Sequence, residues 1–277
     1  MSIREIERIA WSPSAFETSL SSHTPVVIRG LGDRLGRADH WQLESLAQTL
    51  KGVLSQVATG HGPPMVTNPV AYLKGRRYVK RPFDDYAKAL REGRIAPEGD
   101  YLTDHFVAAS PQMAPMMNPA NEALAVLCGR SKWSWQFAQQ TPTLWVGPPG
   151  VVTPLHYDRL ENVHAQFEGR KRWVLLAPHQ REAVYCNSDE LPTQLYSPVD
   201  VLKPDLDRYP RFTEAQQWST VVEPDEMLYV PSGWWHHVHT LERSVSMTFW
   251  FWSFRATQTI ARLVAGELMK RLKTLTH

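Results

Sequence analysis

The second half of this chain is a series of short apolar segments separated by turn residues, and this pattern constrains the fold most. β-Branched and aromatic residues gather in segments such as 143–146 (TLWV), 162–167 (NVHAQF) and 244–252 (SVSMTFWFW). Nine of the 11 tryptophans lie at or after Trp133. Closely spaced segments of this composition are typical of strands in an antiparallel barrel or sandwich. The pattern therefore predicts a β-rich core in this half of the chain.

The first half has a mixed α and β pattern. Residues 26–29 (VVIR) form a short apolar run closed by Gly30, which predicts a buried strand. Helical spacing of apolar residues, with Gly93 as a stop signal after the second run, predicts helices at 40–50, 82–92 and 119–128. We therefore expect three parts: a mixed α/β region at 1–140 that packs on the core, a barrel at 141–255 and a helix at 256–277.

Charge and composition exclude several classes of protein. The chain has 30 Lys and Arg against 28 Asp and Glu, a formal charge of +2, which provides no large field to attract nucleic acid or a membrane. Its two cysteines, Cys128 and Cys186, are too few for a disulfide scaffold. No stretch approaches the ~18 consecutive apolar residues of a membrane span. We expect a cytoplasmic protein without a membrane partner.

The last 22 residues predict an amphipathic helix. Its apolar positions fall on one stripe, formed by Ile260, Leu263, Val264, Leu268 and Leu272. Such a stripe packs either on the barrel or on a second copy of the chain, so a homodimer through this helix is one expectation.

A candidate metal site follows from histidine and aspartate spacing. His156 and Asp158 are two residues apart, and residues i and i+2 of a strand point to the same face. A second predicted strand, at 231–241, carries His236, His237 and His239. His237 and His239 share one face, whereas His236 shares the other with Val238. Two imidazoles and one carboxylate leave coordination positions open, as expected for a non-haem iron(II) enzyme.

The segments around these residues resemble the JmjC-type, cupin-like oxygenases. The resemblance is carried by TPLHYDRLENVHAQFEGRKRWVLLAPHQ at 153–180 and VVEPDEMLYVPSGWWHHVHTL at 221–241, with weaker similarity at 197–212 and in the PVVIRG opening. Within the family, the sequence is most similar to the asparaginyl hydroxylase that inhibits hypoxia-inducible factor and to its bacterial cupin-like relatives. The resemblance implies a double-stranded β-helix (jelly-roll) core, with His236 as the third ligand of an Fe(II) site.

The resemblance also implies that 2-oxoglutarate and O₂ are cosubstrates. It assigns Lys171 to the distal carboxylate of 2-oxoglutarate, beside Thr153, Asn162 and Tyr101. Lys171 alternates with two arginines, which should point outward if Lys171 points into the barrel. From the residues alone, Lys171 could be a solvated hairpin lysine, Asn162 a strand-end capping residue and Tyr101 a core tyrosine.

Two positions depart from the family pattern in the cosubstrate pocket. Thr248 stands where the family often has Asn, and it reaches less far as a hydrogen-bond donor. His164 stands where that asparaginyl hydroxylase has an apolar wall, so it either hydrogen-bonds cosubstrate or substrate or only stacks. Trp235, Val238 and Trp250 would shape the pocket or belong to the barrel core.

The substrate that the resemblance favours is a protein side chain, hydroxylated with release of succinate and CO₂. The proline-rich segment 187–212 is too long for a hairpin and would help to hold an extended peptide. RNA is a disfavoured alternative, suggested by the basic run 74–81 (KGRRYVKR), and N-methyl-lysine is another. A non-catalytic, metal-binding cupin module is the alternative from a different class.

Overall fold

The structure is a computed structural model. It describes residues 3–30, 35, 38–59, 75, 77–97, 99–104, 110–118, 142–186, 195–254, 256–261 and 265.

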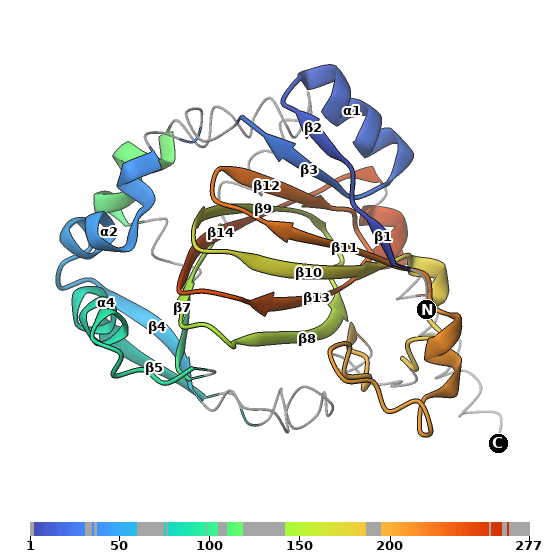
Figure 1. The fold of residues 1–277 in the computed structure, drawn as a ribbon. Helices are drawn as coiled ribbons and strands as arrows, with labels where there is room; N and C mark the ends of the chain where they lie inside the picture. Colours follow the sequence, from blue (N-terminus) through green and yellow to red (C-terminus); the bar gives the residue numbers. More distant parts are fainter. Residues whose placement is uncertain are drawn as a thin grey trace.

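Two β-sheets face each other and form the body of the molecule (Figure 1). In the described chain, the minor sheet consists, in order, of β1 (Ile3–Glu5), β11 (Gln217–Val222), β10 (Lys171–Leu176), β13 (Trp235–Thr240) and β8 (Val152–Tyr157). The major sheet consists, in order, of β2 (Arg8–Ala10), β3 (Val26–Arg29), β12 (Glu226–Val230), β9 (Glu161–Glu168), β14 (Ser244–Phe251), β7 (Thr143–Gly147), β6 (Tyr101–Asp104), β4 (Leu54–Thr59) and β5 (Arg77–Pro82).

This arrangement confirms the expected cupin-like jelly-roll class. Neighbouring strands are antiparallel apart from β1 with β11 and β2 with β3, which are parallel. Strands from the first 140 residues extend both sheets, because β1 joins the minor sheet and β2 to β6 flank the major one. The proposed boundary between residues 140 and 141 stays a prediction.

Three helices pack their apolar side chains into a core shared with the major sheet: α1 (Pro13–Ser22), α2 (Leu43–Thr49) and α4 (Phe83–Arg91). Helix α4 matches the expected 82–92, and Gly93 follows it with a left-handed φ of 67°. The helix expected at 40–50 is shorter than predicted. Residues 38–41 form a 3₁₀ turn, and the extended Gln42 separates this turn from α2.

Other expectations concern residues beyond the described ranges. The helix expected at 119–128, Cys128 and most of the C-terminal stripe lie outside them; the start of the C-terminal helix is described at 256–261. Cys186 is buried and not disulfide-bonded. No described helix is long and apolar enough to cross a bilayer.

Buried side chains divide the strands of the minor sheet into an inner and an outer face. Trp173, Leu175 and Val238 pack between the two sheets, whereas Val174, Leu176 and Trp235 belong to a cluster with apolar residues of the described segments 183–186 and 195–215. Trp235 packs edge-on against Tyr157, with 4.7 Å between ring centroids. Trp235 is one residue from His236 and therefore lies on the opposite face, so of its two alternatives, shaping the pocket or packing in a core, the structure supports packing in a core.

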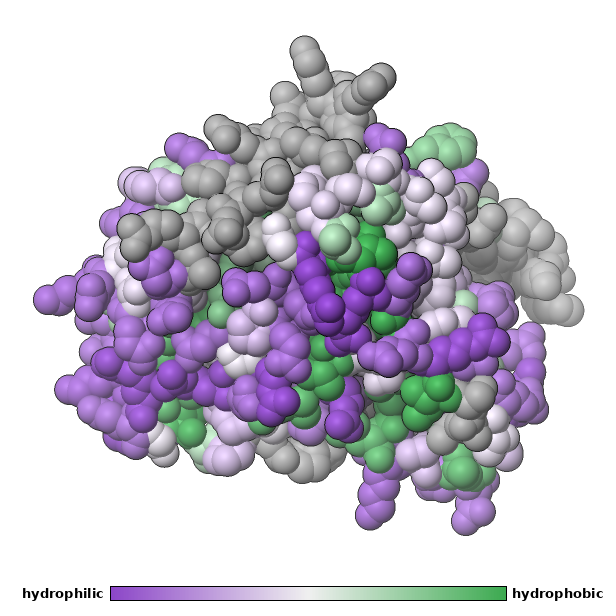
Figure 2. Space-filling model, turned by 45° about the horizontal axis from the view of Figure 1, so that its top comes forward, coloured by the Kyte–Doolittle hydropathy of each residue, from purple (hydrophilic) through white to green (hydrophobic). Residues whose placement is uncertain are grey.

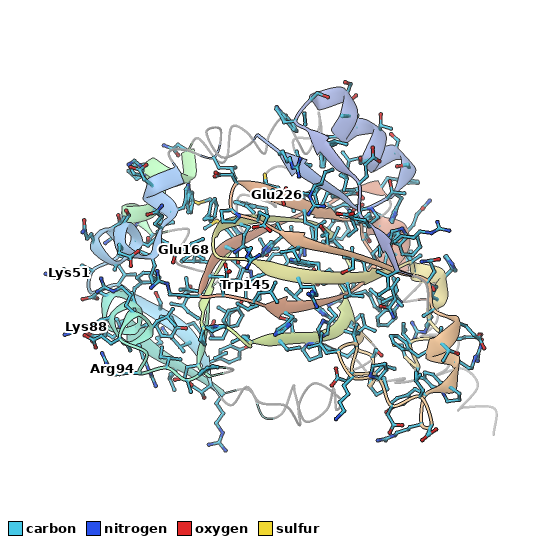
Figure 3. The ribbon with its side chains drawn as sticks, in the orientation of Figure 1. Lys51, Lys88, Arg94, Trp145, Glu168 and Glu226 are labelled. Atoms are coloured by element: carbon cyan, nitrogen blue, oxygen red, sulfur yellow. The ribbon has the colours of Figure 1, made fainter. Side chains whose placement is uncertain are left out.

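The surface seen in Figure 2 is mostly hydrophilic, and hydrophobic residues are exposed there as separate patches. Figure 3 shows Trp145 among the strands, whereas Lys51, Lys88 and Arg94 project outward at the end formed by α2 and α4.

Candidate metal centre

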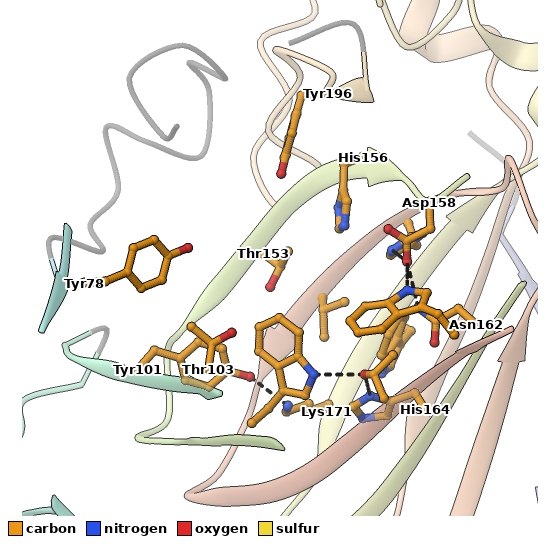
Figure 4. A pocket seen from close by; sticks show the side chains of 16 residues that line it. Tyr78, Tyr101, Thr103, Thr153, His156, Asp158, Asn162, His164, Lys171 and Tyr196 are labelled. Atoms are coloured by element: carbon orange, nitrogen blue, oxygen red, sulfur yellow. Dashed lines mark hydrogen bonds and ion pairs between the residues drawn. The ribbon is translucent and has the colours of Figure 1, made fainter. Parts of the chain in front are cut away.

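Three side chains converge at one place between the sheets. His156 and Asp158 come from the end of β8, and His236 comes from the neighbouring strand β13, where it pairs directly with His156. One ligand-capable atom from each residue lies within 4.8 Å of the others. Asp158 Oδ2 and His236 Nε2 are 3.8 Å apart, and the two imidazole centroids are 4.2 Å apart. His156 and Asp158 lie near each other at one end of the pocket in Figure 4.

Strand parity selects the third member of this cluster. His237 points to the other face of β13 and has no hydrogen-bond partner on either ring nitrogen among the described residues. The alternation in the sequence had left open which histidine joined His156. The structure therefore places His236, as the resemblance implied, beside His156 and Asp158.

Backbone carbonyls fix the orientation of both imidazoles. His156 Nδ1 lies 2.8 Å from the carbonyl oxygen of Pro154, and His236 Nδ1 lies 3.0 Å from that of Trp234. A carbonyl only accepts, so each Nδ1 donates its hydrogen and each Nε2 keeps a lone pair. This is the way in which a metal-binding histidine is usually oriented.

Asp158 is held by two donors. Its Oδ2 accepts hydrogen bonds from Asn162 Nδ2 and from Trp250 Nε1, each at 2.9 Å. Burial alone would raise the pKa of Asp158, but the two histidines and these hydrogen bonds hold it below its ordinary value.

The protonation states suit a divalent metal. Burial, followed by the neighbouring His236, lowers the pKa of His156 to about 4. At neutral pH the cluster therefore holds an ionised carboxylate beside a neutral His156. Metal ligands must be deprotonated, so the donor set is ready for an ion.

The cluster opens into a cavity of about 230 Å³ that extends between the sheets. Thr153, Asn162 and Tyr101 line it, as do Val238 and Trp250. Asn162 Oδ1 is buried and has no partner among the described residues, so it can accept a hydrogen bond from a ligand or water. The residues that the resemblance assigned to one pocket are thus together in space.

Lys171 lies in the pocket wall. Its Nζ donates to Tyr101 Oη at 2.9 Å and to Ser246 Oγ at 2.7 Å, and the side chain is 1% exposed. Burial lowers the pKa of Lys171 to about 7. No described carboxylate is within ion-pairing distance of this amine. A buried cation of this kind favours an anionic ligand.

The turn before Lys171 fixes its direction. Gly169 has a left-handed φ of 68°, and a Cβ at this position would collide with the backbone carbonyl of Arg243. From this turn, Lys171 points inward, whereas Arg172 is exposed and Arg170 pairs with Glu242 at the surface. The alternation expected from the sequence is confirmed.

The tautomer of His164 follows from its neighbour Gln166. Gln166 Nε2 donates to the carbonyl oxygens of Glu168 and Gly169, at 2.7 and 3.0 Å, so its Oε1 must face His164. His164 Nε2 therefore donates to Gln166 Oε1 over 3.1 Å. Burial, followed by Lys171, holds the pKa of His164 well below its ordinary value. The ring is neutral, and its Nδ1 is an acceptor.

That acceptor faces Thr248. Trp145 Nε1 donates to Thr248 Oγ1 at 3.0 Å, and the same hydroxyl lies 3.3 Å from His164 Nδ1, to which it can donate. Both ring nitrogens of His164 are thus engaged within the protein. His164 and Thr248 line the pocket, but their described hydrogen bonds connect the strands rather than point to a ligand.

Several residues that line the pocket or contact its lining were not anticipated from the sequence. Ser246 alternates with Thr248 along β14, and this spacing of hydroxyl side chains was the available signal. Tyr196 stacks on His156, with ring centroids 5.3 Å apart, and forms an isolated β-bridge with it. Tyr78 enters the lining from β5. Only the fold could bring these two tyrosines to the pocket.

Comparison with known proteins agrees with this architecture. A metal-binding cluster between the sheets of a jelly roll defines the class, and a family model described as "Cupin-like domain" matches residues 12–257. The chain belongs to this family.

Three relatives show the range of similar proteins. Lysine-specific demethylase 8 of Xenopus tropicalis is 37% identical over 113 residues, 41% of this chain and 25% of that protein. HSPB1-associated protein 1 of Homo sapiens is 36% identical over 116 residues, which are 40% of this chain and 23% of that protein. Lysine-specific demethylase JMJ30 of Arabidopsis thaliana is 31% identical over 184 residues, which are 63% of this chain and 38% of that protein. The matches span less than half of each relative.

Proposed function

We propose that this protein is an iron(II)- and 2-oxoglutarate-dependent oxygenase that hydroxylates a protein side chain. The observation that carries the proposal is the pairing, in one pocket, of an open two-histidine, one-carboxylate cluster with a buried lysine that has no described counter-anion. A closed structural metal site has no need of such a lysine. A dicarboxylate that reached from the metal to Lys171 would occupy the open side of the cluster and supply a counter-anion for the lysine.

The residues present fit an iron(II) ion. The Nε2 atoms of His156 and His236 and the carboxylate of Asp158 would hold it on one side and leave the pocket side open. When bound, iron(II) would supply the chemistry that couples decarboxylation of 2-oxoglutarate, to succinate and CO₂, with insertion of oxygen into a C–H bond of the substrate.

The protein's own part is binding, orientation and exclusion of water. Lys171, with the hydroxyls of Tyr101 and Ser246, would bind the distal carboxylate of 2-oxoglutarate, and Thr153 lies on the same pocket surface. Trp250 and Asn162 keep Asp158 in place. Trp173 and Val238 cover the inner wall with apolar surface.

A protein substrate is favoured by the mouth of the pocket. Tyr196 belongs to the 187–212 segment, so the described part of this segment reaches the site as expected of a peptide-holding loop. Two of the relatives are named lysine-specific demethylases, so N-methyl-lysine is the second candidate for the same chemistry. Particular closeness to the asparaginyl hydroxylase, dimerisation through the C-terminal helix and a cytoplasmic location stay predictions.

The test is substrate-independent turnover of 2-oxoglutarate. Protein reconstituted with iron(II) should form succinate slowly in the absence of substrate, and His156→Ala and Asp158→Ala should abolish this reaction. Lys88→Ala, on the outer side of α4, is a matched control and should turn over like the wild type. Succinate formation no higher in the wild type than in the two ligand variants would favour the non-catalytic cupin module.

A further inference from the structure

The pocket-facing surface of the major sheet continues beyond the pocket. Tyr78 pairs across β5 and β4 with Ala58, and Ala58 pairs with Tyr101 on β6. Directly paired residues of neighbouring strands share a face, so Tyr78 lies on the same face as Tyr101. Lys80 is two residues further along β5 and joins this face. We call this surface, formed by Gln56, Ala58, Tyr78 and Lys80, the β5 ledge.

The β5 ledge lies at the mouth of the pocket, and its two β5 side chains are exposed, whereas Ala58 beneath them is buried. β5 is the last strand of the major sheet, and Arg77 to Arg81 are exposed along it, with Tyr78 49% exposed. Tyr78 also lines the cavity, and in Figure 4 it lies across the opening from Thr153 and Tyr196. A segment resting on the ledge would therefore have a side chain within reach of the metal cluster.

The ledge is positively charged. Strand β5 has three described cationic side chains, Arg77, Lys80 and Arg81. Arg81 is paired with Asp100 at 3.1 Å. No described carboxylate pairs with Lys80 or Arg77. These two cations therefore remain available to an anionic partner, and Lys80 is on the ledge itself.

The lining of the pocket indicates the charge of the target side chain. Among the described residues that line the cavity, the sole carboxylate is Asp158, which belongs to the metal cluster. A cationic target would meet Lys171 and no other described carboxylate, and its desolvation would be uncompensated. The lining instead offers hydroxyls, aromatic rings and an amide, which suit a neutral side chain.

We propose that the β5 ledge binds an extended, acidic protein segment that presents a neutral target side chain to the metal cluster. Lys80 contacts the acidic residues beside the target, and Tyr78 packs against the segment. β4 is the described neighbour of β5, so the other edge of β5 has backbone donors and acceptors suited to an extended peptide. This inference rests on the proposed function and specifies its substrate class.

The test uses three peptide libraries of equal length, with a randomised neutral centre and flanks of Glu, Gln or Lys. Binding is measured by fluorescence anisotropy, and turnover by succinate formation above the substrate-free rate. The wild type should bind the Glu-flanked library best, and Lys80→Glu should weaken this binding about three- to tenfold and favour Lys flanks instead. Lys80→Arg should keep the wild-type preference. Lys88→Glu, the same charge change on α4, should have no effect.

The outcomes separate the ledge from the oxygenase proposal. Flank selectivity that depends on Lys80, without succinate formation, would support the ledge and reject the oxygenase. Turnover that is equal for all flanks, or unchanged by Lys80→Glu, would overturn the ledge alone. Preferential binding of the Lys-flanked library, or of a single-stranded RNA oligomer over every peptide, would also overturn it. Thermal unfolding of each variant verifies that the fold is retained.

Discussion

Replacing Lys171 by Met should increase the stability of the metal-free protein and at the same time weaken its binding of 2-oxoglutarate. The lysine is 1% exposed and has no described counter-anion, so burial lowers its pKa from 10.5 to about 7. At about 1.4 kcal/mol per pKa unit, that difference corresponds to a penalty of roughly 5 kcal/mol when the folded protein holds the proton. Methionine has similar length and no charge.

Two hydrogen bonds reduce the expected gain. Lys171 donates to Tyr101 and Ser246, and each lost bond costs about 1 kcal/mol. The net gain at pH 7 is therefore about 2–3 kcal/mol. Since 1 kcal/mol moves the melting temperature of a chain of this size by about 2–4 °C, the metal-free variant should melt roughly 5–10 °C higher.

The pH dependence has a definite sign. Below pH 7, Lys171 is protonated in both the folded and the unfolded chain, and the whole penalty is present. Between pH 7 and 10.5, the folded chain has lost the proton that the unfolded chain keeps, so the wild type gains stability as pH rises. The difference in melting temperature between variant and wild type should be largest near pH 6 and should become small towards pH 10.

Binding should change in the opposite direction. Removing one partner of a buried ionic contact costs about 2–5 kcal/mol, which is a loss of about 30-fold to several thousandfold in affinity for 2-oxoglutarate. Differential scanning calorimetry measures the melting temperature, and isothermal titration calorimetry measures the affinity for 2-oxoglutarate. A variant that melts below the wild type at pH 6 would refute the assignment of Lys171 as a destabilising, ligand-directed cation.

Three further predictions follow from the same contacts. In calorimetric titrations, the affinity of the wild type for 2-oxoglutarate should be constant below pH 7. Above pH 7 it should fall up to about tenfold per pH unit, because Lys171 loses its proton. The affinity for 2-oxopentanoate, which lacks the second carboxylate, should show no such fall. Trp250→Phe removes a donor to Asp158 and should weaken iron(II) binding about tenfold in a metal-competition assay, while unchanged affinity would exclude this role. His164→Phe removes the hydrogen-bond donor to Gln166 Oε1 and the acceptor for the Thr248 hydroxyl, and should lower the free energy of unfolding by about 1–3 kcal/mol in urea. The variant should change 2-oxoglutarate affinity less than Lys171→Met does; the reverse order would make His164 a cosubstrate ligand.

The sequence by itself determined a β-rich barrel or sandwich and two members of the metal cluster, because both depend on local periodicity. Alternating apolar residues predicted the strands, and the i, i+2 relation placed His156 and Asp158 on one face without knowledge of the partner strand. Parity likewise excluded His237 from the face of His236, whose selection over its neighbours came from the resemblance. The same rule would have placed Trp235 outside the pocket.

The tertiary structure decided which distant residues complete the site. Tyr196 and Tyr78 are 40 residues after and 78 residues before His156 in the chain, and no periodicity connects them with it. Ser246 reaches Lys171 because β14 and β10 belong to opposite sheets, a relation set by sheet packing. The hydrogen bonds of His164 depend on the orientation of Gln166, which two backbone carbonyls of the following turn fix. Interactions between strands and sheets thus determined the pocket and brought His236 beside His156, whereas residue order within a single strand had already placed His156 and Asp158 together.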